Sequence, residues 1–166
     1  TGSNNVGIGV AANQFRIRGD NNIVIGNFAG EQDSTSNNTV LIGRLAGRLN
    51  SRDGIVAIGF QSLINNSTGL GSNPLDSALY NTAVGFNSLV NNTKGGWNTA
   101  IGYQAGQNNS TGFYNTSLGV NALYNTTTAN NNTAVGTSAG DSYVNGNSNT
   151  FIGASSDVNA AARVNA

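Results

Sequence analysis

The amino-acid sequence predicts an all-β protein built as a parallel β-solenoid, or β-roll, of about nine coils. A short unit, Asn-Thr/Val/Ile-x-aliphatic-Gly, recurs along the chain with a period close to seventeen positions. Helical repeats are about 33–47 residues long, so this period is too short for them. Asn, Gly, Ser and Thr, which are poor helix formers, make up about half of the chain. Seventeen residues suit one solenoid coil, which we expect to contain two short strands and two turns.

The copies can be aligned on one anchor glycine each. The anchor glycines are Gly9, Gly26, Gly43, Gly59, Gly85, Gly102, Gly119, Gly136 and Gly153. Successive anchors are seventeen positions apart, except for a shorter interval from Gly43 to Gly59 and a longer one from Gly59 to Gly85. The long interval locates an insertion, because residues 59–69 match residues 102–112. The extra residues are 70–78, which hold the only proline and are predicted to leave the ladder as a loop. We expect one array over residues 1–166 with this insertion.

Two columns of residues precede the anchor glycine. The residue immediately before it is a large aliphatic in every copy, which predicts a structural core column. This column consists of Ile8, Ile25, Ile42, Ile58, Val84, Ile101, Leu118, Val135 and Ile152. The residue three positions before the glycine is β-branched, Val or Ile in the first four copies and Thr in the last five. Since alternate strand residues point to one face, we expect both columns to face the core.

Asparagine and small residues fill two further columns. Asn stands four positions before the anchor glycine in seven copies, where stacked coils would align the amides as a ladder. These residues are Asn5, Asn22, Asn81, Asn98, Asn115, Asn132 and Asn149. Ala or Ser stands three positions after every anchor glycine, which predicts close approach of another backbone. The predicted core is thin for this length, so we expect burial between chains in a parallel homotrimer.

The composition excludes several classes of function. Charged residues are 8% of the chain and the net charge is zero, so nothing predicts a nucleic-acid partner. No apolar run approaches the roughly 20 residues that span a bilayer, which predicts no membrane insertion. Without His, Cys or a phosphate-binding loop, we expect no enzyme activity, no catalytic residue, no metal and no cofactor. Glu31 and Asp33 are interpreted as a solvated turn.

Aromatic residues form two periodic columns. Tyr80, Trp97 and Tyr114 recur at the repeat period and are predicted to stack as a ladder on one edge. A second column, one position after the anchor glycine, contains Phe60, Phe86 and Tyr103. One interpretation is that the ladders stabilise the solenoid or a seam between chains. The other is that Tyr80, Trp97 and Tyr114 are a possible contact for sugar rings on a host surface, bordered by the 70–78 loop.

The segments NTAIGYQAG, NTSLGVNAL, NTAVGTSAG and NTFIGASS resemble the repeats of bacteriophage tail fibres and related fibrous surface proteins. They are also similar to the YadA-like head repeats of trimeric autotransporter adhesins, whose consensus is near N-S-x-A-I-G-x-x-S-x-A. The resemblance covers nearly the whole chain, although the adhesin unit is shorter than the unit of this chain. It implies a left-handed parallel β-roll, assembled as a homotrimer and displayed on a virion or outside the cell.

The predicted function is that of a structural and adhesive fibre segment, a rigid spacer and host-surface attachment element. Because the repeat pattern runs to both ends, we expect a segment of a longer fibre. The expected partners are other copies, as a homotrimer or stacked filament, and a host polysaccharide or receptor. The alternative is a self-assembling extracellular filament or a bacterial trimeric adhesin subunit. A remote alternative is an ice-binding solenoid, disfavoured because the Thr column shares a face with the predicted core and no T-x-T pair occurs.

Overall fold

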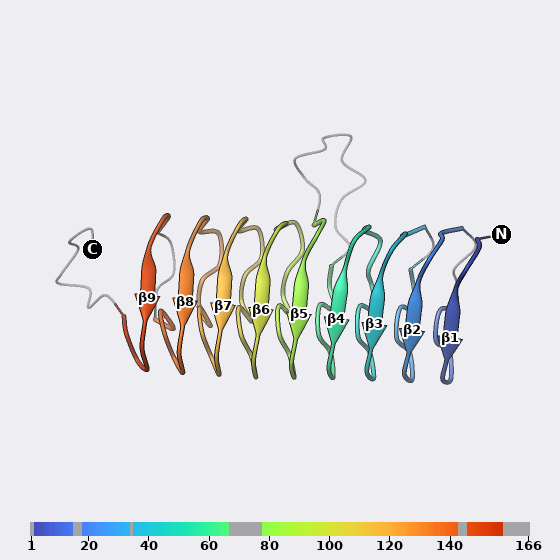
Figure 1. The fold of residues 1–166 in the computed structure, drawn as a ribbon, viewed down its shortest axis with the longest axis horizontal. Coiled ribbons are helices and arrows are strands. Elements are labelled where there is room, and N and C mark those ends of the chain that lie inside the picture. Colours follow the sequence, from blue (N-terminus) through green and yellow to red (C-terminus); the bar gives the residue numbers. More distant parts are fainter. Residues whose placement is uncertain (1, 15–17, 34, 67–77, 143–145, 158–166) are drawn as a thin grey trace.

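The computed structural model describes residues 2–14, 18–33, 35–66, 78–142 and 146–157. In these residues, nine three-residue strands form one parallel sheet in sequence order, and the coils follow one another along a rod (Figure 1). The strands are β1 (Val6–Ile8), β2 (Ile23–Ile25), β3 (Val40–Ile42), β4 (Val56–Ile58), β5 (Thr82–Val84), β6 (Thr99–Ile101), β7 (Thr116–Leu118), β8 (Thr133–Val135) and β9 (Thr150–Ile152). The all-β parallel solenoid is therefore confirmed.

Each described coil has one strand rather than the two that were predicted. The rest of the coil turns at residues with positive φ, which fall five positions before, two after and four after the anchor glycine. In the second coil these are Asn21, Phe28 and Gly30, at φ values of 59°, 56° and 53°. A left-handed residue at each bend interrupts extended backbone, so no second strand forms.

The register between strands follows the sequence columns. In the β5–β6 pair, Thr82 faces Thr99 and Val84 faces Ile101, and the other pairs keep the same alignment. Strands β4 and β5 pair in register as well, although the insertion lies between their anchor glycines. The ladder therefore continues past the insertion. The loop predicted at 70–78 lies outside the described residues, apart from Ala78, which is buried.

The predicted core column is on the wrong side of the sheet. The burial pattern of most strands shows the central residue buried and the two flanking residues less so. The column Ile8, Ile25, Ile42, Ile58, Val84, Ile101, Leu118, Val135 and Ile152 therefore points outward, and every member is partly or fully exposed. The two predicted columns do share a face, but it is the outer face. We call the first and third residues of β1 to β9 the outer apolar face.

The core is made by the central strand residues together with the residues four positions after the anchor glycine. These two columns complement each other in size. Leu41, at the centre of β3, lies over Gly47, where a methyl group would be 2.6 Å from its Cδ2 atom. In the next coil the sizes are reversed, because Ala57 stands at the centre of β4 and Leu63 is fully buried. At these two positions none of the first eight coils carries two large side chains, which is why Ala, Ser or Gly occurs at one or both of them.

We predict that the large and the small inward residue of one coil can change places. Leu41→Ala should lower the free energy of unfolding by about 2–5 kcal/mol through a cavity, and Gly47→Leu should be destabilising through overlap with Leu41. The double variant should be more stable than the sum of the two effects, because it copies the Ala57–Leu63 arrangement. Leu63 itself has a φ of 48°, close to the 54° of Gly47, so the backbone accepts leucine there.

Urea unfolding of the wild type and these three variants measures the coupling between the sites. A favourable coupling of about 1 kcal/mol or more is expected for residues in contact. Strict additivity would contradict the assignment of these two columns as one shared core.

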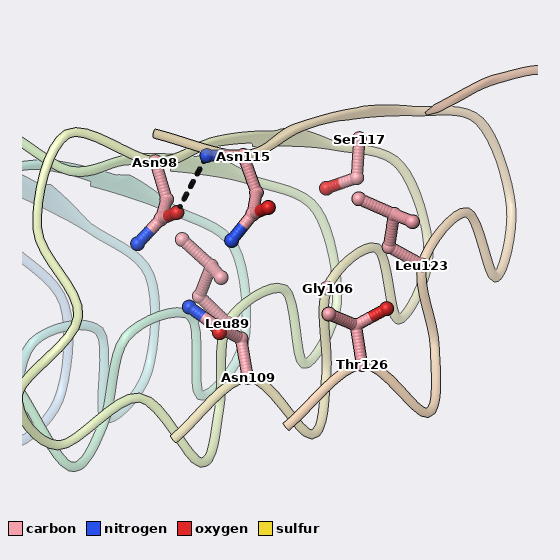
Figure 2. Close-up of a pocket in the computed structure, with 8 residues that line it drawn as sticks. All are labelled: Leu89, Asn98, Gly106, Asn109, Asn115, Ser117, Leu123 and Thr126. Atoms are coloured by element: carbon pink, nitrogen blue, oxygen red, sulfur yellow. Dashed lines mark hydrogen bonds between the residues drawn. The ribbon is translucent and has the colours of Figure 1, made fainter. Parts of the chain in front are cut away.

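The asparagine ladder is present and closes six of the described coils, whereas Thr39 and Ile55 take its position in the third and fourth coils. Asn115 donates from Nδ2 to the carbonyl oxygen of Ala129, later in the same coil, at 2.8 Å. Its Oδ1 accepts the backbone N–H of Asn132 in the next coil at 3.0 Å. Its own N–H donates to Oδ1 of Asn98 in the preceding coil at 2.9 Å (Figure 2). One buried amide therefore holds its own coil shut and joins it to both neighbours.

A second buried polar column lies seven positions after the anchor glycine. It contains Asp33, Asn50, Asn66, Asn92 and Asn109, all 2% exposed or less. The Asp33 carboxylate accepts from the backbone N–H of Ser36 at 3.1 Å and also from its hydroxyl. The interpretation of Glu31 and Asp33 as a solvated turn is therefore wrong for Asp33, which occupies an Asn position in this ladder. Glu31 is less buried and pairs with Arg48 at 2.5 Å.

Candidate functional site

An internal hollow of about 10 Å³ lies in the core beside Gly106 (Figure 2). Here both inward columns carry a small residue, since Ala100 stands at the centre of β6 and Gly106 follows four positions after the anchor glycine. Leu89 and Leu123 of the adjacent coils line the hollow from either side. A volume of this size is near the lower limit for one water molecule. We assign it to imperfect packing and not to ligand binding.

The predicted aromatic ladder is present on the outside of the coils. The rings of Tyr80 and Trp97 have centroids 5.7 Å apart and are tilted by 39°, while Trp97 and Tyr114 stack at 5.3 Å and 20°. Tyr80 and Tyr114 are each 54% exposed and Trp97 is 37% exposed. The sequence thus placed these three side chains correctly, both in contact with one another and at the surface.

The aromatic ladder occupies a strained backbone position. Tyr80, Trp97 and Tyr114 have φ values of 55°, 55° and 58°. Bulky side chains are uncommon at such values, whereas Asn and Gly tolerate them. Other coils follow this preference, with Asn21 and Asn131 at the equivalent position and φ values of 59° for both. Three consecutive aromatic residues at this position oppose local stability, which is a pattern that accompanies functional sites.

Stacking leaves few ring faces open. Trp97 lies between Tyr80 and Tyr114, so both of its faces are covered at least in part. The face of the Tyr80 ring that Trp97 does not cover packs against Gly54 of the preceding coil. A methyl group added at Gly54 would lie 2.6 Å from the Tyr80 ring. The following coil carries only Asn131 beside Tyr114, and this side chain is too short to cover a tyrosine ring. Tyr114 is therefore the member of the ladder with an open face.

An external pocket of about 280 Å³ lies at this end of the ladder. We call it the Tyr114 pocket, and it is lined by Trp97, Phe113, Tyr114, Asn130 and Asn131. The Phe113 ring is tilted against both neighbours, with centroids 6.3 Å from Trp97 and 6.3 Å from Tyr114. None of the five lining residues is ionisable except the Tyr114 phenol. The pocket combines three aromatic rings with two carboxamides.

The two carboxamides have unused hydrogen-bonding capacity. Asn130 accepts the backbone N–H of Phe113 on Oδ1 at 2.7 Å, which fixes the amide and leaves Nδ2 with no partner among the described residues. In the first coils the equivalents of Asn131 bond along the stack, as Asn4 does to Asn21 at 3.1 Å. Asn131 lies between Tyr114 and Ser148 in its column, and its amide has no partner in the described part of the chain. Both amides can therefore bond a ligand.

Sequence reasoning missed Phe113, Asn130 and Asn131. A signal for them was present, because the pair Phe113–Tyr114 is followed one repeat later by Asn130–Asn131. In a stack of coils, such a change along one column creates a step from large rings to short amides. The step is where a hollow forms, since the short side chains leave the last ring uncovered.

The second aromatic column also stacks. Phe60 and Phe86 have centroids 5.0 Å apart at 21°, and Phe86 and Tyr103 have centroids 5.4 Å apart at 14°. The Arg44 guanidinium lies 5.6 Å from the centroid of Phe60. This column lies two positions after the last residue of each strand, and its Phe86 and Tyr103 rings are exposed.

The outer apolar face leaves large aliphatic side chains in contact with solvent. Ile8 is 58% exposed, Leu118 is 45% exposed and Ile152 is 72% exposed. No member of the face carries a charge. With nine strands about 4.8 Å apart, the face is about 38 Å long. Its length and composition distinguish it from the scattered apolar residues of an ordinary protein surface.

Known proteins add no further assignment. Comparisons with protein-family models, curated proteins and solved structures gave no match to this chain. Within the described ranges, no three acidic, His or Cys side chains cluster closely enough to hold a metal ion. The same part of the chain forms no apolar helix of membrane-spanning length. The outer apolar face and the Tyr114 pocket are thus the two surface features that require a function.

Proposed function

We propose that this chain is a self-associating structural segment of a surface fibre, in which the outer apolar face is the seam between copies. The observation that carries the proposal is the outward direction of two columns of large aliphatic and β-branched residues. Their uniformity is typical of buried positions, yet nothing within the described residues covers them. A second copy of the same face offers a complementary surface of equal length and equal apolar character.

The proposed assembly is a homotrimer. Three rods can each turn this face toward a common axis, which buries all three faces and leaves no free edge of the seam. The resemblance to tail-fibre repeats and to trimeric adhesin heads supports this arrangement. The same resemblance supports a location on a virion or at a cell surface, as one segment of a longer fibre.

The proposed role is that of a stiff spacer that also contacts the host surface. Every described coil is joined to its neighbours by backbone hydrogen bonds and by at least one buried polar column. Bending such a rod would stretch bonds in several columns at once, so it resists deformation along its length. A self-assembling extracellular filament is the alternative use of the same face and the same rod.

We expect light scattering to give a mass three times that of the 16.9 kDa chain. The variant Ile101→Lys/Leu118→Lys should scatter as a monomer, because it places two charges per chain in the centre of the seam, where unpaired burial is costly. Both side chains point outward, so the circular dichroism of the coils should be retained. The matched control is Asn91→Lys/Asn108→Lys, which adds the same charge at two exposed amides of neighbouring coils.

The control variant should remain a trimer. A wild-type chain that scatters as a folded monomer at all concentrations would refute the seam. A mass that grows without limit with concentration would favour the filament over the closed trimer.

Ice binding remains a second candidate because of where the Thr column lies. Thr82, Thr99, Thr116, Thr133 and Thr150 belong to the outer apolar face and are partly or fully exposed. The objection that this column faces the core no longer holds. The Val and Ile residues of the first four copies and the missing T-x-T pairs still oppose this function. Thermal hysteresis of a monomeric wild-type chain would favour it over the seam.

A further inference from the structure

We propose that the Tyr114 pocket binds one neutral hexopyranose residue of a surface polysaccharide. This inference rests on the proposed role in host-surface contact and names the ligand class and the residues that would recognise it. The sugar would stack its apolar C–H face on the open face of Tyr114. Its hydroxyl groups would bond the carboxamides of Asn130 and Asn131.

The open ring face is the first support. Pyranose rings carry axial C–H groups on a flat face, and such a face requires an exposed aromatic ring parallel to it. Tyr80 and Trp97 present mainly ring edges, because stacking and Gly54 cover their faces. Tyr114 alone in the ladder combines an uncovered face with a pocket at that face. The ladder behind it holds the ring in place, so little conformational entropy is lost when a ligand stacks.

The polar groups of the pocket are the second support. A ring hydroxyl both donates and accepts, and a carboxamide offers one donor group and one acceptor group. Asn130 presents a free Nδ2, while Asn131 presents both ends of its amide among the described residues. Amides next to a sugar-sized apolar surface suit hydroxyl recognition, and they would not compensate a carboxylate or sulfate. The pocket therefore selects a neutral sugar.

The size of the pocket limits the ligand to one ring. Sites for drug-sized molecules occupy about 300–1,000 Å³, and this pocket, at about 280 Å³, lies just below that range. The neighbouring residues of a polysaccharide would extend into solvent. Single-ring sites bind weakly, so firm attachment would come from several copies in an assembled fibre, each contributing one site.

The strained backbone is the third support. Asn is accommodated at the same left-handed position in other coils, so Tyr114 is not required by the fold. The substitution Tyr114→Asn should therefore remove the ring without disturbing the coil. Tyr80→Asn is the matched control, because it removes a ring of the same column at the far end of the ladder.

Trp97 provides the readout, since it is the only tryptophan and lines the pocket. The full chain is titrated with the neutral tetrasaccharides cellotetraose, maltotetraose and β-1,4-galactotetraose, and with acidic polygalacturonate, while Trp97 emission is recorded. Saturation-transfer NMR with the same probes gives a second measurement that does not depend on the tryptophan. At least one neutral probe should bind, and polygalacturonate should not.

Tyr114→Asn should weaken binding of that probe about tenfold or more, and Asn131→Ala should weaken it about threefold to tenfold. Tyr80→Asn should leave the affinity within about twofold of wild type. No binding of any neutral probe, or an equal loss in Tyr114→Asn and Tyr80→Asn, would overturn the inference. A trimer without sugar binding fails this inference alone, whereas a sugar-binding monomer fails the fibre proposal alone.

Discussion

Gly102→Ala is expected to lower the free energy of unfolding by more than about 4 kcal/mol, a loss that few single substitutions reach. Gly102 has a φ of 140°, a conformation that alanine rarely adopts. The added methyl group would also lie 2.6 Å from the carbonyl carbon of Gly119 in the next coil. Gly119 cannot withdraw easily, because its N–H donates to the carbonyl oxygen of Ile101 at 2.9 Å. Strain and overlap therefore act together.

Gly153→Ala separates these two causes. Gly153 holds the same position in the ninth coil with a φ of 115°, and nothing among the described residues lies within 4 Å of the methyl group it would gain. We expect it to lose only the strain contribution, about 1–3 kcal/mol. Urea unfolding followed by circular dichroism compares the two variants at one wavelength. Equal losses would mean that the close approach of the coils contributes nothing at Gly102.

The second large effect is expected for Asn115→Ala, which should lower the free energy of unfolding by about 2–5 kcal/mol. The substitution leaves the buried carbonyl oxygen of Ala129 and the buried N–H of Asn132 without their partners. Each unsatisfied buried group costs about 1–3 kcal/mol. The closure of one coil and its attachment to the next are lost together.

Asn108→Ala is the matched control for the ladder. Asn108 belongs to an exposed run of amides, accepting from Asn91 at 2.9 Å and donating to Asn125 at 3.3 Å. Water can replace both bonds, so the expected change is within about 0.5 kcal/mol. The comparison is made by urea unfolding of both variants under one set of conditions. A loss at Asn108 as large as that at Asn115 would show that burial does not govern the strength of the ladders.

The sequence period was sufficient to predict the solenoid, the anchor glycines, the in-register columns and the aromatic ladder. It did not reveal which side of the strand faces inward. Uniformly aliphatic columns such as the one containing Ile101 were interpreted as core, while the central column, with Ala100 and Ser117, is small and partly polar and carries no such signal. The structure reverses this, because a narrow coil interior is filled by small residues and amides.

The candidate site was predicted in part for a related reason. A period identifies what repeats, so Tyr80, Trp97 and Tyr114 were found from their spacing. The Tyr114 pocket depends on where the repetition stops, at the step from Phe113 and Tyr114 to a pair of asparagines. The depth of that step depends on how far the rings tilt and stack, and spacing alone does not encode this tilt. Asp33 was also misplaced. Its charge suggested a position at the surface, but it occupies one position in a column of buried asparagines and is itself buried.

The exchange of size between the two inward columns has a consequence for how such a chain can be lengthened by gene duplication. Copying one coil keeps every backbone ladder, but the new neighbours must still fit inside. A coil centred on a residue like Leu41 needs glycine in the coils it reaches, as Gly30 and Gly47 provide. A duplicated coil is therefore retained only where its central strand residue, large or small, fits the inward residues of the coils on either side. Rod length can evolve freely, whereas the order of coil types is under selection.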